Sequence, residues 1–248
     1  MSNGVRFLYN TTKVYPDMIK VIIYKEPMLI NVQGGSKRNK EVVDEDYTPD
    51  VTSLRRTKTL IKDIILSNDF EYFCTFTFDP KKCDRFSFAS CYHKMSTWLH
   101  HQADLSRSFG ERFEYLVVPE QHKSGAWHFH ALISHYKGSL SASGCKTSTG
   151  RDIYNISSFR SGFTTAVPID NKESVGNYVM KYITKDFIKQ FNQRRFFCSR
   201  SLKRPVKISN SDIFRNVLPI FRHKLSESDY SSTYMIDRES SLFSDFPF

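Results

Sequence analysis

The chain has 248 residues and a formal net charge of +10, from 36 Lys plus Arg against 26 Asp plus Glu. Hydrophobic residues make up 40% and charged residues 25%, which is typical of a globular protein and excludes a disordered or collagen-like chain. No run approaches the roughly 20 apolar residues of a membrane span, and the polar start lacks the apolar stretch of a signal peptide. We therefore expect a cytoplasmic protein with no membrane partner, whose five cysteines are reduced because none forms a C-x-x-C pair.

The first predicted elements are strands, followed by a helix. Residues 18–32 contain two β-rich runs separated by Pro27, so we expect residues 1–50 to form an N-terminal hairpin and extension. Between residues 54 and 66 apolar side chains recur at helical spacing, while the other face is basic. This pattern predicts an amphipathic helix.

The next predicted elements are a strand over residues 72–78 and a second helix. Alternation along the strand places Phe73, Thr75 and Thr77 on one face and the more apolar side chains on the other. Between residues 87 and 101 apolar residues recur at steps of three and four. This spacing predicts an amphipathic helix that packs on the core.

Three further strands are predicted, at residues 113–119, 127–134 and 163–169. The first two flank the turn-forming sequence HKSGA, which predicts a hairpin. Residues 138–150 are rich in Gly, Ser and Thr, so we expect a flexible loop there.

The last predicted helix runs from residue 171 to about residue 191, with Asn171 as a candidate N-cap. The element order, with its adjacent hairpins, predicts an α+β fold in which helices pack on one face of an antiparallel sheet. Residues 211–248 are expected to form a flexible tail, because its C-terminal part is Ser-rich and acidic.

Most of the positive charge lies in one segment. Between Lys181 and Lys207 there are nine basic residues and one acid, interleaved with aromatic residues. Such a segment suits nucleic acid, because cations neutralise phosphates and aromatic faces stack on bases, although an ordinary solvated basic face has the same composition. The candidate DNA-binding residues are Lys181, Lys189, Arg194, Arg195, Arg200, Lys203 and Arg204.

The sequence His128-Phe129-His130 lies inside a predicted strand, so both imidazoles leave the same face and can bind one ion. The neighbouring strand of the hairpin brings Glu120 close as a third candidate ligand, with Gln121 and His122 as alternatives. Two imidazoles and one carboxylate suit a divalent ion such as Mg²⁺ or Mn²⁺. Taken alone, the triplet is equally typical of two partly exposed histidines on a sheet.

Tyr178, Tyr182 and Lys185 are spaced by four and three residues, which places them on one face of a helix. A tyrosine hydroxyl can attack phosphorus and store the energy of a broken phosphodiester as a covalent phosphotyrosine. With a pKa near 10 it needs an activated electrophile and nearby positive charge. Two aromatic residues that merely pack are the simpler interpretation of this motif by itself.

The joint occurrence of these motifs resembles the HUH endonuclease superfamily, specifically the two-tyrosine rolling-circle replication initiators of small phages and plasmids. The resemblance rests on CTFTFD at residues 74–79, WHFHALI at residues 127–133 and YVMKYITK at residues 178–185. It implies a ferredoxin- or RRM-like endonuclease domain over residues 51–210, with a sheet of about five antiparallel strands.

The resemblance also implies the roles of the site residues. His128 and His130 would bind the catalytic Mg²⁺ or Mn²⁺ with Glu120 as third ligand, Tyr178 and Tyr182 would be nucleophiles, and Lys185 would orient or neutralise the phosphate or phenolate. The implied activity is strand-specific nicking and rejoining of DNA in a bacterial host cell.

The expected partners are single-stranded or origin-hairpin DNA, the host DNA polymerase and a host helicase, because the chain has no G-x-x-x-x-G-K-[ST] phosphate loop of its own. Rival interpretations are a mobilisation relaxase or transposase with the same chemistry, a non-catalytic single-strand-binding module, and a histidine-based phosphohydrolase acting on nucleotides.

Overall fold

A computed structural model describes residues 5–31, 51–182, 195–210 and 224–237. The chain divides into two compact units, of which the larger spans residues 45–203 and the smaller combines residues 1–44 with 204–248. The described residues form three α-helices and two antiparallel sheets, so the α+β prediction is confirmed.

The larger unit contains a sheet in which the described strands follow the order β6-β7-β8-β3-β5-β4-β9. It has seven strands where the sequence indicated about five, because β6, β7 and β9 were not predicted. All neighbouring strands run antiparallel. The strands are β3 (Tyr72–Phe78), β4 (Glu114–Gln121), β5 (Trp127–Ser134), β6 (Leu140–Lys146), β7 (Asp152–Ile156), β8 (Gly162–Pro168) and β9 (Phe197–Cys198).

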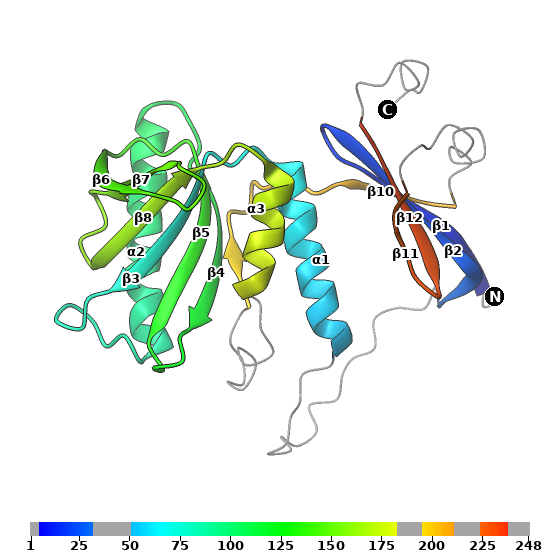
Figure 1. The fold of residues 1–248 in the computed structure, drawn as a ribbon, viewed down its shortest axis with the longest axis horizontal. Coiled ribbons are helices and arrows are strands. Elements are labelled where there is room, and N and C mark those ends of the chain that lie inside the picture. Colours follow the sequence, from blue (N-terminus) through cyan, green and yellow to red (C-terminus); the bar gives the residue numbers. More distant parts are fainter. Residues whose placement is uncertain (1–4, 32–50, 183–194, 211–223, 238–248) are drawn as a thin grey trace. The chain divides into compact units, whose positions relative to one another are not determined.

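Helices cover both faces of this sheet, so the prediction that they share one face is wrong (Figure 1). On one face α2 (Phe88–Ser108) packs its buried side chains against the apolar residues of β3, β4 and β5. On the other face α1 (Val51–Ser67) and α3 (Lys172–Val179) form a second apolar cluster with Leu116, Val118 and Leu132. Both faces of the central strands are therefore partly buried, which gives them longer apolar runs than a one-sided sheet has.

The helix bounds follow local capping signals. Ser87 caps α2 and Asn171 caps α3, as predicted for Asn171, each through a side-chain oxygen that accepts a backbone N–H three residues on. Helix α2 ends seven residues later than predicted, at Ser108, just before Gly110 adopts a positive φ of 73°. Beyond α3, residues Met180–Tyr182 form a 3₁₀ turn, and the remainder of the predicted helix lies outside the described residues.

Residues 138–150 contain β6 rather than the expected flexible loop. This strand pairs with β7 at the edge of the sheet and most of its side chains are exposed. Because an exposed edge strand needs few apolar residues, its Gly- and Ser-rich sequence carries no alternation that would have indicated a strand.

Gly162 allows β8 to pass close to the end of β3. A Cβ at this position would collide with the backbone oxygen of Thr77, so a side chain could be accommodated only if one strand moved. The close approach sets the register in which Phe163 pairs with Thr77 and Thr165 with Thr75.

The smaller unit contains a second antiparallel sheet, in the order β10-β1-β2-β12-β11. Strand β2 continues through Pro27 instead of breaking there, because Pro27 falls where the pairing register with β1 shifts. The expected hairpin of the N-terminal region is formed by β1 and β2 together. The strands are β1 (Val5–Val14), β2 (Met18–Asn31), β10 (Val206–Ser209), β11 (Lys224–Glu227) and β12 (Ser231–Asp237).

Residues 224–237 differ from the flexible tail that was expected over 211–248. β12 pairs with β2 from Met18 to Tyr24, and β11 pairs with β12. The acidic composition was misleading, because β12 is ordered by a strand that lies near the other end of the chain. The described residues contain no helix that is long and apolar enough to cross a membrane.

Candidate active site

Three neighbouring strands of the larger unit bring Glu120, His128 and His130 to one face of the sheet. β3 and β4 flank β5, so His128 lies directly opposite Glu120 on β4 and Thr77 on β3, and His130 lies opposite Thr75. The Nε2 atom of His130 lies 2.9 Å from Oε2 of Glu120. The hairpin therefore produces the proximity that the sequence predicted for these residues.

Hydrogen bonds from β3 orient both imidazole rings. Thr75 Oγ1 lies 3.1 Å from Nδ1 of His130, and Thr77 Oγ1 lies 3.1 Å from Nδ1 of His128. When a hydroxyl engages Nδ1, Nε2 is the ring nitrogen that remains for a ligand. The Phe-Thr alternation of β3 thus supplies the two hydroxyl groups that fix the histidines in one orientation.

The environment of His128 favours its neutral form. Burial lowers the pKa of His128, the neighbouring His122 and His130 lower it further, and Arg85 acts in the same direction against the opposing effect of Glu120. A neutral imidazole keeps a lone pair available for a proton or a metal ion. Arg85, just before α2, was not identified from the sequence because it belongs to no motif.

The structure separates Glu120 from its two alternatives. The Gln121 side chain points along the β4–β5 turn and donates to the carbonyl of Gly125 at 3.0 Å, since adjacent residues of a strand face opposite sides. His122 bonds to Ser124 within the turn, and its ring centroid lies 5.6 Å from that of His128. Glu120 is the candidate whose side chain reaches His130 itself.

Both tyrosines lie over this face of the sheet. Tyr178 comes from α3 and Tyr182 from the 3₁₀ turn that follows, and their rings meet edge to face with centroids 5.3 Å apart. The Tyr182 ring stacks on His130 with a centroid separation of 3.6 Å and an interplanar angle of 20°. Phe73 packs against both tyrosines, so β3 also contributes to their placement.

The two tyrosines have different surroundings. Tyr178 is 42% exposed, and the ammonium group of Lys181 lies 5.3 Å from the centre of its ring. Tyr182 is partly buried, and burial, the Tyr178 side chain and Glu120 raise its pKa well above the usual value. Tyr178 is therefore the more accessible hydroxyl, and it has a cation beside it.

The predicted basic residues are distributed differently from one another. Lys181 lies beside Tyr178, whereas Arg195 donates to Thr57 of α1 at 2.9 Å and so helps to hold that helix. Arg200, Lys203 and Arg204 are exposed. The remaining predicted site residues, Lys185, Lys189 and Arg194, lie outside the described residues.

The fit of a divalent ion can be judged from the side chains present. Two imidazole nitrogens and a carboxylate form a mixed donor set on one sheet face, and both imidazoles are held through Nδ1. Within the described ranges, no three His, Cys, Asp or Glu side chains already form a compact ligand group. The donor chemistry fits Mg²⁺ or Mn²⁺, and it requires the His130–Glu120 contact to open toward the ion.

A cleft of about 490 Å³ adjoins the tyrosines. It lies between the N-terminal part of α3, the end of β8 and the turn that joins β6 to β7, and Phe73, Thr75 and Tyr178 form part of its wall. Arg151 holds this turn in place, because its guanidinium contacts the Asp170 carboxylate and the Pro168 carbonyl, both at 3.3 Å. Hydroxyl groups from three separate segments meet here, which no local sequence pattern could have indicated.

Phe163 adds an exposed aromatic ring to the same face. It pairs with Thr77 across β3 and β8, so its side chain projects on the side of the sheet that carries His128. Its exposed fraction is 78%, which is exceptional for a phenylalanine on a strand. The prediction of a strand from residue 163 included this residue without noticing its exposure.

Residues 71–187 match the family model of the replication-associated protein ORF2. The match begins just before β3 and includes the histidine strand and both tyrosines, that is, all the residues of the site described above. It supports a family of replication initiators and a role in starting DNA replication. No curated protein and no solved structure matches the chain.

Proposed function

We propose that this protein is an HUH-type endonuclease of the two-tyrosine class, which starts rolling-circle replication by nicking one DNA strand. The observation that carries this proposal is the stacking of Tyr182 on His130, beside Tyr178, on a face where threonines orient both histidines. Packing alone would not require hydroxyls, imidazoles and a carboxylate to meet at one partly exposed place.

In the proposed reaction the phenolic oxygen of Tyr178 forms a bond to phosphorus while the bond from phosphorus to the 3′ oxygen breaks. The phenolic proton is lost and the departing oxygen gains one, which leaves a free 3′-OH and a 5′-phosphotyrosine. Tyr178 acts first because it is the more exposed of the two tyrosines and has Lys181 beside it. Tyr182 is then available for a second transfer that rejoins the strand.

The chain's own residues prepare this reaction. Glu120, His128 and His130 would hold a divalent ion, which when bound would polarise the scissile phosphate and stabilise its developing charge. Thr75 and Thr77 keep the imidazoles in their orientation, and the cleft next to Tyr178 provides space for a nucleotide beside the scissile phosphate. The 3′-OH would serve the host polymerase as a primer.

The proposal is tested by incubating the full chain with Mn²⁺ and end-labelled single-stranded DNA that carries the intergenic hairpin of its own replicon. We expect a labelled band that survives SDS, migrates with the protein and is absent when EDTA replaces Mn²⁺. Binding without any adduct would instead identify a single-strand-binding module, and release of a free product that needs neither tyrosine would identify a phosphohydrolase.

Phe163→Ala is expected to weaken binding of single-stranded DNA. A base stacked on an exposed aromatic ring contributes about 1–3 kcal/mol, so the Kd should rise roughly 5- to 150-fold. Fluorescence anisotropy in EDTA measures this effect without cleavage. Phe109→Ala is the matched control, because Phe109 is 63% exposed at the end of α2 and is not part of the site; an equal loss in both variants would contradict a specific role for Phe163.

A further inference from the structure

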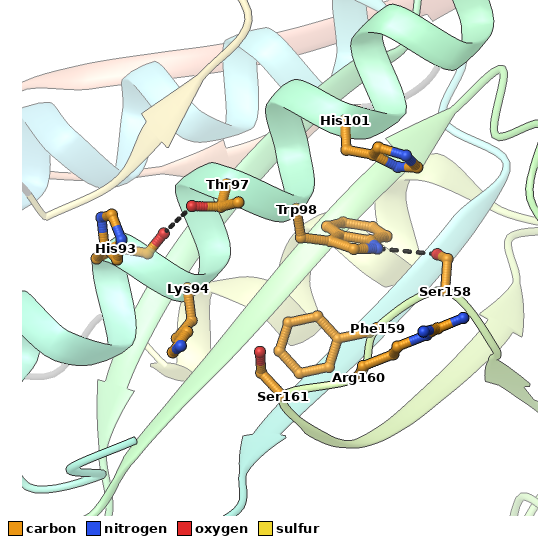
Figure 2. A pocket seen from close by; sticks show the side chains of 9 residues that line it. All are labelled: His93, Lys94, Thr97, Trp98, His101, Ser158, Phe159, Arg160 and Ser161. Carbon is orange, nitrogen blue, oxygen red and sulfur yellow. Dashed lines mark hydrogen bonds between the residues drawn. The ribbon is translucent and has the colours of Figure 1, made fainter. Parts of the chain in front are cut away.

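A second cleft lies on the α2 face of the seven-stranded sheet, opposite the face that carries the histidines. It has a volume of about 600 Å³ and is walled by α2 and by the segment that joins β7 to β8 (Figure 2). Trp98 and Phe159, which line it, belong to the apolar cluster of the α2 face. Neither the sequence motifs nor the proposed nicking reaction involves this cleft.

The lining of the cleft is cationic. Lys94 and Arg160 carry permanent charges, His93 and His101 can add more, and the lining contains no Asp or Glu. Figure 2 shows Lys94 and Arg160 on opposite sides of the Phe159 ring. Two cations separated by an apolar surface suit successive phosphates of a strand better than a single small anion.

The wall of the cleft is held in place by hydrogen bonds. Trp98 Nε1 donates to Ser158 Oγ at 2.9 Å, and the same oxygen lies 2.8 Å from the Tyr136 hydroxyl. Lys82 Nζ donates to the carbonyl of Arg160 at 2.7 Å. Because these contacts fix both the base and the rim, a ligand would meet a preformed surface and would not have to order it.

The floor of the cleft is apolar and closed. Trp98 is 6% exposed and Phe159 is 4% exposed, and their rings meet edge to face with centroids 6.0 Å apart. Rings buried to this extent offer an edge or a small patch for a sugar, not an open face for a base. The cations on the rim would therefore dominate binding, and the cleft would not discriminate between base sequences.

We infer that this cleft binds the phosphodiester backbone of a DNA strand away from the nicking site. The inference rests on the proposed function in one respect, namely that DNA is the substrate. Since the sheet separates the cleft from Tyr178, the bound segment is a different part of the DNA from the one that is cut. The cleft would thus increase affinity for long DNA without taking part in the chemistry.

The test compares wild type with a Lys94→Glu and Arg160→Glu double variant. The probe is a fluorescein-labelled single strand of about 40 nucleotides, longer than the site of one single-strand-binding fold, and anisotropy is measured in EDTA. We expect binding to weaken about 10-fold at 0.1 M salt, and the slope of log K against log salt to fall by about 1.4, or about 0.7 for each lost phosphate contact.

The control carries Arg107→Glu and Arg112→Glu, which change the net charge equally. Both arginines are exposed and lie outside the cleft, and the ion pair of Arg107 with Asp104 is fully at the surface. Equal binding by the wild type and the cleft variant, or an equal loss in the control, would overturn the inference. So would competition by free dATP that the cleft variant abolishes, because the ligand would then be a free nucleotide.

A second measurement separates this inference from the proposed function. Covalent adduct formation on an oligonucleotide of about 8 nucleotides, which is within the span of one single-strand site, should be unchanged in the cleft variant. Absence of the adduct in wild type, together with the binding difference on the long strand, would refute the nicking proposal and leave the cleft. Normal adduct formation without any binding difference would do the reverse.

Discussion

Tyr178→Phe is expected to reduce the initial formation of the covalent adduct on single-stranded origin DNA by at least about 10³-fold, because it removes the nucleophilic oxygen but keeps the ring. Tyr182→Phe should retain most of the first cleavage, since Tyr182 stacks on His130 while Tyr178 is the more exposed hydroxyl. The double variant should form no adduct. Denaturing gels with a time course of labelled DNA measure all three rates.

The tyrosine substitutions have a built-in control for folding and binding. Phenylalanine preserves the edge-to-face contact of the two rings and their packing on Phe73, so thermal stability and DNA affinity should change little. Tyr230→Phe is a matched control, because Tyr230 is 80% exposed in the smaller unit. An adduct that persists in the double variant would show that another group attacks, and a greater loss in Tyr182→Phe would reverse the proposed order.

The elements that position the site could be predicted from the sequence because their signals are local. Alternation in β3 separates the threonines from the buried phenylalanines, and the turn sequence between β4 and β5 fixes a hairpin that brings Glu120 opposite His128. In such a hairpin the register follows from the turn itself. The observed strand Trp127–Ser134 agrees with the predicted bounds for the same reason.

Other features depend on contacts between distant segments, so no local pattern indicates them. Strand β12 finds its partner in β2, and edge strand β6 is stabilised by pairing with β7 rather than by burial of apolar residues. The stacking of Tyr182 on His130 joins residues 52 positions apart. Arg160 acquires its position in the cationic cleft only when the loop after β7 folds against α2.

The distribution of positive charge was predicted only in part. A count of basic residues drew attention to the segment from Lys181 to Lys207, where Arg195 is engaged with Thr57 in the structure. The cleft on the α2 face collects its charges from separate places in the chain, so none of them belongs to a basic run. For a protein that handles DNA, the folded arrangement of cations is therefore more informative than their density along the sequence.

His128→Ala is expected to abolish adduct formation, by at least about 10³-fold, while the affinity for single-stranded DNA in EDTA stays within about 3-fold of wild type. The size of the loss follows from the several kcal/mol of charge stabilisation that a bound divalent ion supplies to a transferring phosphoryl group. Wild-type activity should disappear on chelation and return with added Mn²⁺. A Mn²⁺ titration of adduct formation at fixed DNA concentration is the measurement.

Two further variants keep this prediction testable if alanine disturbs the fold. Glu120→Gln preserves size and hydrogen bonding but removes the charge, so the Mn²⁺ concentration at half-maximal activity should rise about 10- to 100-fold. His100→Ala is the control, because this exposed histidine of α2 bonds to Ser96 of its own helix, away from the site. If His128→Ala nicks normally, or if Glu120→Gln leaves the Mn²⁺ dependence unchanged, the three residues do not bind the ion, and the histidines serve only to pack beneath Tyr182.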